Sequence, residues 1–176
     1  MRYFYDTEFI EDGTTITLIS IGVVAADGRE YYAVSTDADL ASAGKWVREH
    51  VLPKLPNPSS PLWKSNTQIR QDLLDFFAQG EGRDGTPELW AWVGAYDHIV
   101  LAQLWGDMAA LPAHIPHYTR ELRQYWEMAG RPTLPKAPSN SHDALADARH
   151  NAVKFQACMQ VLPLDHRNAV QLPPTV

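Results

Sequence analysis

The first fifth of the chain has the residue pattern of β-strands. Three stretches rich in aromatic and β-branched residues, 3–10, 15–25 and 29–35, are separated by Asp-Gly turn signals at 12–13 and 27–28. Two tight Asp-Gly turns in succession typically join neighbouring antiparallel strands. The pattern therefore predicts an antiparallel three-strand meander at the N-terminus.

Farther along the chain, apolar residues recur with helical spacing, and shorter strand-like runs lie between them. The expected helices cover residues 39–52, 67–79, 97–104, 119–129 and 141–161. Residues 88–96 have the composition of a buried strand, and a further short strand fits around 115–118. A meander followed by mixed helices and strands predicts an α/β fold, in which helices flank a mixed sheet with antiparallel and parallel strands.

Length and composition limit the class of protein. A chain of 176 residues has the length of one domain. We expect that domain over residues 1–162 and a loosely packed, polar C-terminal tail over 163–176. Cys158 is the one cysteine, which excludes an intrachain disulfide and a cysteine-rich zinc site. With no signal peptide and no apolar run of ~18 residues, we expect a cytoplasmic protein with no membrane partner.

The charge balance is acidic. The sequence has 15 Lys and Arg against 21 Asp and Glu, a formal net charge of −6. Taken alone, this balance argues against a protein that wraps nucleic acid with a broadly basic surface.

An acidic pair, Asp6 and Glu8, lies on the first predicted strand. Side chains alternate along a strand, so the two carboxylates share one face, with their Cα atoms about 6.6 Å apart. Such groups are costly near a core unless a cation neutralises them. The pair therefore indicates either a solvated acidic edge or a site of hard oxygen ligands for magnesium or manganese.

Two further acidic signals follow. Asp97 lies where a buried strand meets a helix, which suits a helix cap or a ligand site at a strand end. His142 and Asp147 are about 140° apart around a helix, so they converge only if His142 lies on the preceding loop. Residues 139–141 supply cap residues for that start, and Asp143 would then fall in the first turn.

Together these residues resemble the DEDD exonuclease superfamily, in the DEDDh subgroup that has a catalytic histidine. Asp6 and Glu8 match its first motif, Asp97 its second, and His142 with Asp147 its third. The resemblance covers nearly the whole chain and implies a ribonuclease H-like fold. The compact size is similar to that of the small actinobacterial 3′-exoribonucleases, including the mycobacterial polyadenylate-specific group. One departure is the lack of the Asn that many members have shortly before the central Asp.

The resemblance implies two divalent cations, Mg²⁺ or Mn²⁺, held by the four carboxylates with Asp6 between the ions. Two such ions ~3.5–4 Å apart can hold the attacking water and stabilise the leaving oxygen. His142 would be the general base, since an imidazole titrates near working pH. Thr7, Glu8 and Phe9 are the expected substrate contacts. Glu8 would meet the terminal 3′-hydroxyl, and Phe9 or a nearby aromatic would stack on the last base.

The implied activity is that of a 3′–5′ exoribonuclease. It would act on single-stranded RNA or 3′ overhangs and release nucleoside 5′-monophosphates. We expect a homodimer. One alternative is a DNA-directed exonuclease of the same fold, because contacts to the 2′-hydroxyl make that distinction. The other is a non-catalytic nucleic-acid-binding domain. Bound cations would offset the charge of the four carboxylates. The acidic balance then predicts that the protein contacts only a short stretch at the end of a nucleic-acid strand.

Overall fold

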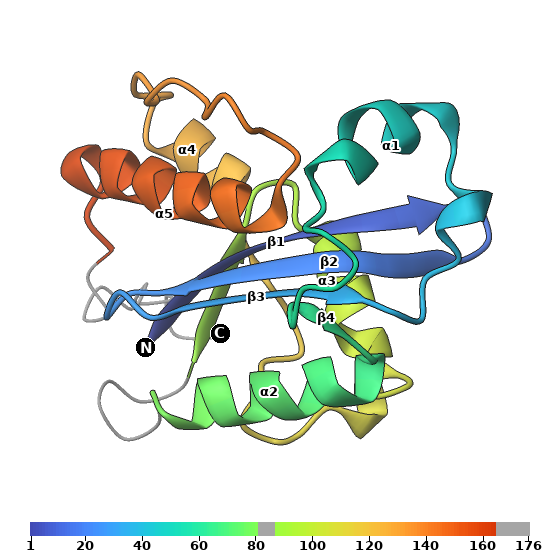
Figure 1. The fold of residues 1–176 in the computed structure, drawn as a ribbon. Coiled ribbons are helices and arrows are strands. Elements are labelled where there is room, and N and C mark those ends of the chain that lie inside the picture. The colour runs from blue at the N-terminus through green and yellow to red at the C-terminus, as the bar shows by residue number, and fades with distance from the viewer. Residues whose placement is uncertain (81–86, 165–176) are drawn as a thin grey trace.

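The computed structural model of the chain describes residues 1–80 and 87–164. Its centre is a six-stranded sheet in the order β4-β3-β2-β1-β5-β6 (Figure 1). The strands β1 (Arg2–Glu11), β2 (Ile16–Ala25) and β3 (Glu30–Ser35) pair antiparallel with their neighbours in the sequence. The predicted meander is therefore confirmed.

Three short strands extend this meander with parallel pairing. The strand β4 (Trp63–Lys64) pairs with β3, β5 (Glu88–Ala91) with β1, and β6 (Arg120–Glu121) with β5. The prediction of a mixed sheet is confirmed. The sequence pattern missed β4, because two residues are too few to show an alternation. The expected strand at 115–118 is wrong, since the pairing falls on β6 just after it.

The helices are α1 (Lys45–His50), α2 (Asn66–Ala78), α3 (Ala95–Gln103), α4 (Leu122–Met128) and α5 (Ala144–Val161). The last four match their predicted ranges closely. The predicted helix at 39–52 is shorter, because α1 is flanked by the 3₁₀ turns Leu40–Ser42 and Leu52–Lys54. Gly44 precedes α1 and Pro53, which lacks a backbone N–H, lies in the second turn.

The strand predicted at 88–96 is also shorter. At Val93 the backbone adopts a φ of 57°, which ends the extended stretch and turns the chain into α3. Gly94 is the N-cap of that helix, and a Cβ there would lie 2.7 Å from the Cβ of Ala91. Asp97 consequently lies in the first turn of α3 and is not its cap.

The helices form a layer on each face of the sheet. In Figure 1, α4 and α5 cover one face and α2 and α3 the other. One hydrophobic cluster joins Tyr3 and Tyr5 to Leu73 of α2, and a second joins Phe4 to Phe155 of α5. Odd-numbered residues at the start of β1 therefore face α2 and α3, and even-numbered ones face α5.

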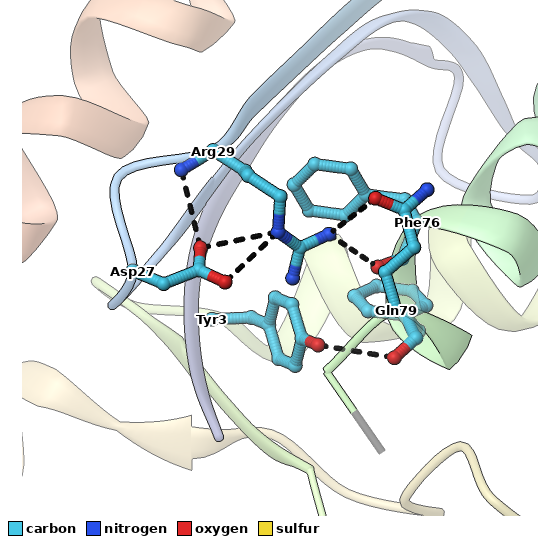
Figure 2. Close-up of polar contacts among 6 residues, drawn as sticks. Tyr3, Asp27, Arg29, Phe76 and Gln79 are labelled. Carbon is cyan, nitrogen blue, oxygen red and sulfur yellow. Dashed lines mark hydrogen bonds and ion pairs between the residues drawn. The ribbon is translucent and has the colours of Figure 1, made fainter. Parts of the chain in front are cut away.

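A polar clamp fastens the sheet to the end of α2 (Figure 2). The Tyr3 hydroxyl donates to the Phe77 carbonyl oxygen over 3.1 Å. The Arg29 guanidinium pairs with the Asp27 carboxylate at 2.9 Å and donates to the Phe76 carbonyl oxygen, also at 2.9 Å. These contacts hold β1 and the β2–β3 turn against α2, and they bury Tyr3 completely.

The end of the described chain packs back on the fold. The Tyr125 hydroxyl donates to the Leu162 carbonyl oxygen, and Leu164 packs against the cluster around Phe4. Cys158 is buried, as expected of a structural cysteine. Residues 165–176 of the expected tail lie outside the described residues, so the boundary at 162 stays a prediction. Within the described ranges, no helix has both the length and the hydropathy to cross a bilayer.

Candidate functional site

The five side chains singled out from the sequence line one cavity of about 420 Å³. They come from β1, the first turn of α3, the loop before α5 and α5 itself. Thr7 and Phe9 also line this cavity. Six further lining residues were not predicted: Trp46, Trp92, Val93, Tyr96, Asn151 and Lys154.

The strand β1 directs Asp6 and Glu8 toward α5. Both follow the alternation that sends Phe4 into the cluster with Phe155. The register between β1 and β2 shifts between Glu8 and Phe9, which marks a β-bulge at the site. Bulges of this kind re-aim side chains and are common next to active sites.

Gly22 brings α5 close to the carboxylates. It pairs with Asp6 across β1 and β2, and a Cβ at Gly22 would lie 2.4 Å from backbone atoms of Ala144 and Leu145. Only glycine allows α5 to begin at this distance, and Asp147 lies one turn farther along α5. Gly22 was not predicted from the sequence, although a lone glycine inside a β-branched strand indicates close backbone approach.

Thr7 holds the carboxylate of Asp97. The Thr7 backbone N–H and its hydroxyl both donate to Asp97 Oδ1, over 2.7 and 2.8 Å. Both residues are buried. The contact found for Thr7 thus fixes the orientation of a candidate metal ligand.

His142 lies on the loop before α5, which is the condition under which it can meet Asp147. Its φ of 67° is left-handed, and its backbone N–H donates to Asp147 Oδ2 over 2.6 Å. One ligand atom each from Glu8, His142 and Asp147 lies within 4.8 Å of the others. Asp143 caps α5 by accepting from the Ala146 N–H at 2.9 Å, so the expected caps at 139–141 are wrong.

The α1 segment packs against the His142 loop. The Trp46 ring meets the His142 ring edge-on at 4.7 Å between centroids, and stacks on His50 at 4.8 Å. Just after α1, the Lys54 ammonium donates to the Ser141 carbonyl oxygen. These contacts join segments about ninety residues apart in sequence, so no local pattern could reveal them.

Burial and mutual repulsion shift the carboxylates of the site. Desolvation raises the pKa of Asp6 well above its ordinary value, and the charges of Asp97, Glu8 and Asp147 raise it further. Burial raises the pKa of Glu8 to about 8, with Asp147 the next cause. Burial also raises the pKa of Asp97 to about 6, although the Thr7 hydrogen bonds oppose this shift. Carboxylates that repel one another in this way favour a bound cation.

The donor set fits hard divalent cations. Four carboxylates converge without a cysteine, and oxygen-rich sites suit magnesium and manganese. His142 differs from them, because burial lowers the pKa of its imidazole and favours the neutral form. The site thus combines oxygens that suit a divalent cation with an imidazole whose neutral form is favoured.

Aromatic rings form another part of the cavity wall. Phe9 and Tyr96 stack with centroids 5.5 Å apart and planes 6° apart. Tyr96 is half exposed and borders the cavity together with Trp92. His98 does not line this cavity, and its Nδ1 lies 3.1 Å from the Thr119 hydroxyl oxygen.

Known proteins resemble this chain in sequence or in fold. A family model described as the 3′-5′ exoribonuclease Rv2179c-like domain matches residues 1–159. The 3′-5′ exoribonuclease Rv2179c of Mycobacterium tuberculosis is 64% identical over 156 residues, which cover 89% of this chain and 92% of that protein.

Solved structures with low sequence identity share the fold. The nuclease domain of 3′hExo, a DEDDh family member bound to rAMP, is 12% identical with a TM-score of 0.57, over 90% of each chain. Pop2p of S. pombe, in an Mg²⁺- and Mn²⁺-bound form, is 13% identical with a TM-score of 0.55, over 90% of this chain and 82% of that one. The mixed sheet with flanking helices is therefore the ribonuclease H-like fold of DEDDh nucleases, and the chain belongs to the Rv2179c-like family of 3′–5′ exoribonucleases.

Proposed function

We propose that this 3′–5′ exoribonuclease removes nucleotides one at a time from the 3′ end of single-stranded RNA or of 3′ overhangs. Two Mg²⁺ or Mn²⁺ ions would assist, and the products would be nucleoside 5′-monophosphates. The observation that carries the proposal is the convergence of Asp6, Glu8, Asp97, His142 and Asp147 on one cavity.

The carboxylates of Asp6, Glu8, Asp97 and Asp147 would hold the ions. When bound, the ions would acidify the attacking water and stabilise charge on the phosphate oxygens. The protein itself supplies fixed ligands: Thr7 orients Asp97, and the His142 backbone N–H orients Asp147. Such preorganisation spares the site a rearrangement during the reaction.

His142 would be the general base. The neutral ring, favoured by burial, accepts a proton from water as the water oxygen bonds to phosphorus. The bond from phosphorus to the 3′ oxygen of the preceding nucleotide breaks, and that oxygen takes up a proton. Trp46 packs against the imidazole and would limit its rotation.

The substrate would enter along the aromatic wall. Glu8 would meet the terminal 3′-hydroxyl. Phe9 stacks against Tyr96, whose half-exposed ring could stack on a base. We therefore propose that Glu8, Phe9 and Tyr96 contact the substrate. For Thr7, the contact to Asp97 supports a positioning role.

Two features support RNA as the substrate. The relative Rv2179c is named an exoribonuclease, and one structural neighbour with a TM-score of 0.57 is a 3′-exonuclease that recognises a histone mRNA stem-loop. A DNA-directed activity predicts equal or faster cleavage of a DNA oligomer of the same sequence. A non-catalytic binding domain would have no chemical need for the histidine beside the carboxylates.

Product analysis tests the proposal. Incubation of single-stranded RNA with Mg²⁺ or Mn²⁺ should yield nucleoside 5′-monophosphates by chromatography, and the matched DNA should be cleaved more slowly. Nucleoside 3′-monophosphates, or cleavage that persists in chelator, would refute the mechanism. The homodimer and the cytoplasmic location stay predictions, which light scattering and cell fractionation would measure.

A further inference from the structure

One lysine stands at the wall of the carboxylate cavity. Lys154 lies on α5 seven residues after Asp147, and Asn151 lies between them at a spacing of four. Residues spaced by three, four or seven share a helix face, so all three point to the cavity. Among the described residues that line it, Lys154 is the sole Lys or Arg.

The ammonium of Lys154 is held in place from two sides. The Asn151 amide donates from Nδ2 to the Tyr5 carbonyl oxygen over 3.1 Å, which fixes the orientation of this buried side chain. Its Oδ1 then accepts from Lys154 Nζ, also over 3.1 Å. On another side, Nζ lies 4.4 Å from the centroid of the Trp92 ring. A long lysine side chain is thus preorganised beside Asp6, the neighbour of Tyr5.

Among the described residues, no ion pair neutralises the positive charge of Lys154. Asp6 and Asp147 are close enough to oppose the lowering that burial imposes on the pKa of Lys154. Yet within residues 1–80 and 87–164 no carboxylate oxygen lies within 4 Å of its nitrogen. An ammonium has three N–H donors, and Asn151 accepts one of them.

Other cations near the site have partners. Lys54 donates to the Ser141 carbonyl oxygen, and Arg149 forms a bidentate pair with Glu30 at 2.8 and 2.5 Å. Lys154 is therefore the fixed positive charge best placed to meet an anion that enters the cavity. RNA brings such an anion in each phosphate of its backbone.

Building on the exonuclease activity proposed above, we propose that Lys154 binds a backbone phosphate of the RNA next to the carboxylate cluster. Asn151 and Trp92 are positioning residues that aim its ammonium. The role is one of substrate binding, because a phosphate held by this lysine places the adjoining terminal bond over the carboxylates.

The test uses Lys154→Met, which removes the charge and keeps the chain length, and Lys154→Arg, which restores a cation. Each is made in a His142→Ala background, and binding of fluorescent single-stranded RNA in Mg²⁺ is followed by anisotropy. We expect about a tenfold higher Kd for Lys154→Met, as for the loss of a charge-assisted hydrogen bond. The slope of log Kd against log salt should fall by about 0.7, the value for one phosphate contact on a single strand.

Arg149→Met is the matched control, since it removes a charge from the same helix outside the cavity. It should leave Kd and slope unchanged, and Lys154→Arg should recover most of the binding. Equal Kd and slope for Lys154→Met would overturn the proposal. So would unchanged RNA binding together with activation at lower metal concentration when Lys154→Met is made in the protein that retains His142, which would make Lys154 a counter-ion of the carboxylates only.

Folding and the underlying activity are checked separately. Circular dichroism confirms that each variant folds, and Lys154→Gln replaces the Met variant if that one does not. Absence of metal-dependent RNA cleavage by the unaltered protein would refute the exonuclease proposal. Normal cleavage by the unaltered protein, combined with unchanged RNA binding by Lys154→Met, would refute only the proposed role of Lys154.

Discussion

The four site carboxylates share one cavity but differ in what surrounds them. Asp97 accepts two hydrogen bonds from Thr7, and Asp147 accepts one from the His142 backbone. For Asp6, burial is the largest cause of a raised pKa, and the charges of Asp97, Glu8 and Asp147 raise the pKa further. Hydrogen bonds stabilise the charged form of an acid, whereas neighbouring negative charges oppose it. A cation bound next to Asp6 would therefore stabilise the charged form of this residue.

We predict that Asp6→Asn and His142→Ala each reduce hydrolysis at least 100-fold while the fold persists, because one removes a ligand and the other the base. Rates on labelled RNA measure the loss, and circular dichroism reports the fold. In chelator, Asp6→Asn should melt above the unaltered protein, since one source of repulsion is gone. Near-full activity in either folded variant would contradict the assigned roles.

The metal-free protein should lose stability as pH rises. The pKa of Glu8 is raised from 4.5 to about 8, so between these values the folded state retains a proton that the unfolded chain releases. The free energy of unfolding therefore falls with increasing pH through this window. In chelator, Tm should decrease from about pH 5 to pH 8. The raised pKa of Asp97 contributes to this decrease in the same direction.

Divalent metal should reverse this trend, because ions bind the deprotonated carboxylates and stabilise the folded state. The rise in Tm on adding millimolar Mg²⁺ or Mn²⁺ should be larger at pH 8 than at pH 6. A metal-induced shift that is absent, or that is larger at low pH, would argue against a carboxylate metal site.

At the scale of secondary structure, the site depends on how closely α5 approaches β2. We predict that Gly22→Ala displaces the first turn of α5, because the new Cβ would overlap the backbone of Ala144 and Leu145. Such overpacking costs about 1–3 kcal/mol of stability and would move Asp147 away from Asp6.

Thermal melting and RNA hydrolysis measure both effects of Gly22→Ala, and activity should fall at least tenfold. Gly44→Ala serves as control, since its added Cβ meets no atom within 4 Å and its φ is −65°. If the two variants behaved alike, the close approach of α5 would not matter to the site.

The sequence predicted the strands and helices whose apolar residues recur with a clear period. It did not predict features that depend on contacts between segments far apart in the chain. The meander and α5 follow from alternation, Asp-Gly turns and a helical stripe. The end of β5 did not, because apolar composition continues through the turn at Val93. The five main site residues were identifiable from their spacing, whereas Trp46, Gly22 and Lys154 depend on which segments fold against one another.

The acidic charge of the protein as a whole fits a site that binds only the end of an RNA strand. The net charge is −6, and four of the acidic groups line the cavity that would receive RNA. Cations bound there would turn a repulsive surface into an attractive one over a few nucleotides. The affinity for RNA should then depend more on bound metal than on a long basic surface.

We predict that a chain ending at residue 164 keeps the activity of the full chain within about twofold, because the sequence predicts a loosely packed, polar tail at the C-terminus. A chain ending at 160 should melt lower, since it lacks Leu164 and the Leu162 carbonyl that accepts from Tyr125. Hydrolysis rates and melting curves of both test the boundary. Loss of activity in the longer truncation product would place residues 165–176 in the working protein.

The most direct test is digestion of single-stranded RNA labelled at its 5′ end, sampled over time with and without Mg²⁺ or Mn²⁺. We expect a ladder that shortens one nucleotide at a time from the 3′ end, dependent on metal and absent with His142→Ala. Internal cuts, immediate loss of the 5′ label, or an intact RNA in the presence of metal would contradict the proposed 3′–5′ mechanism.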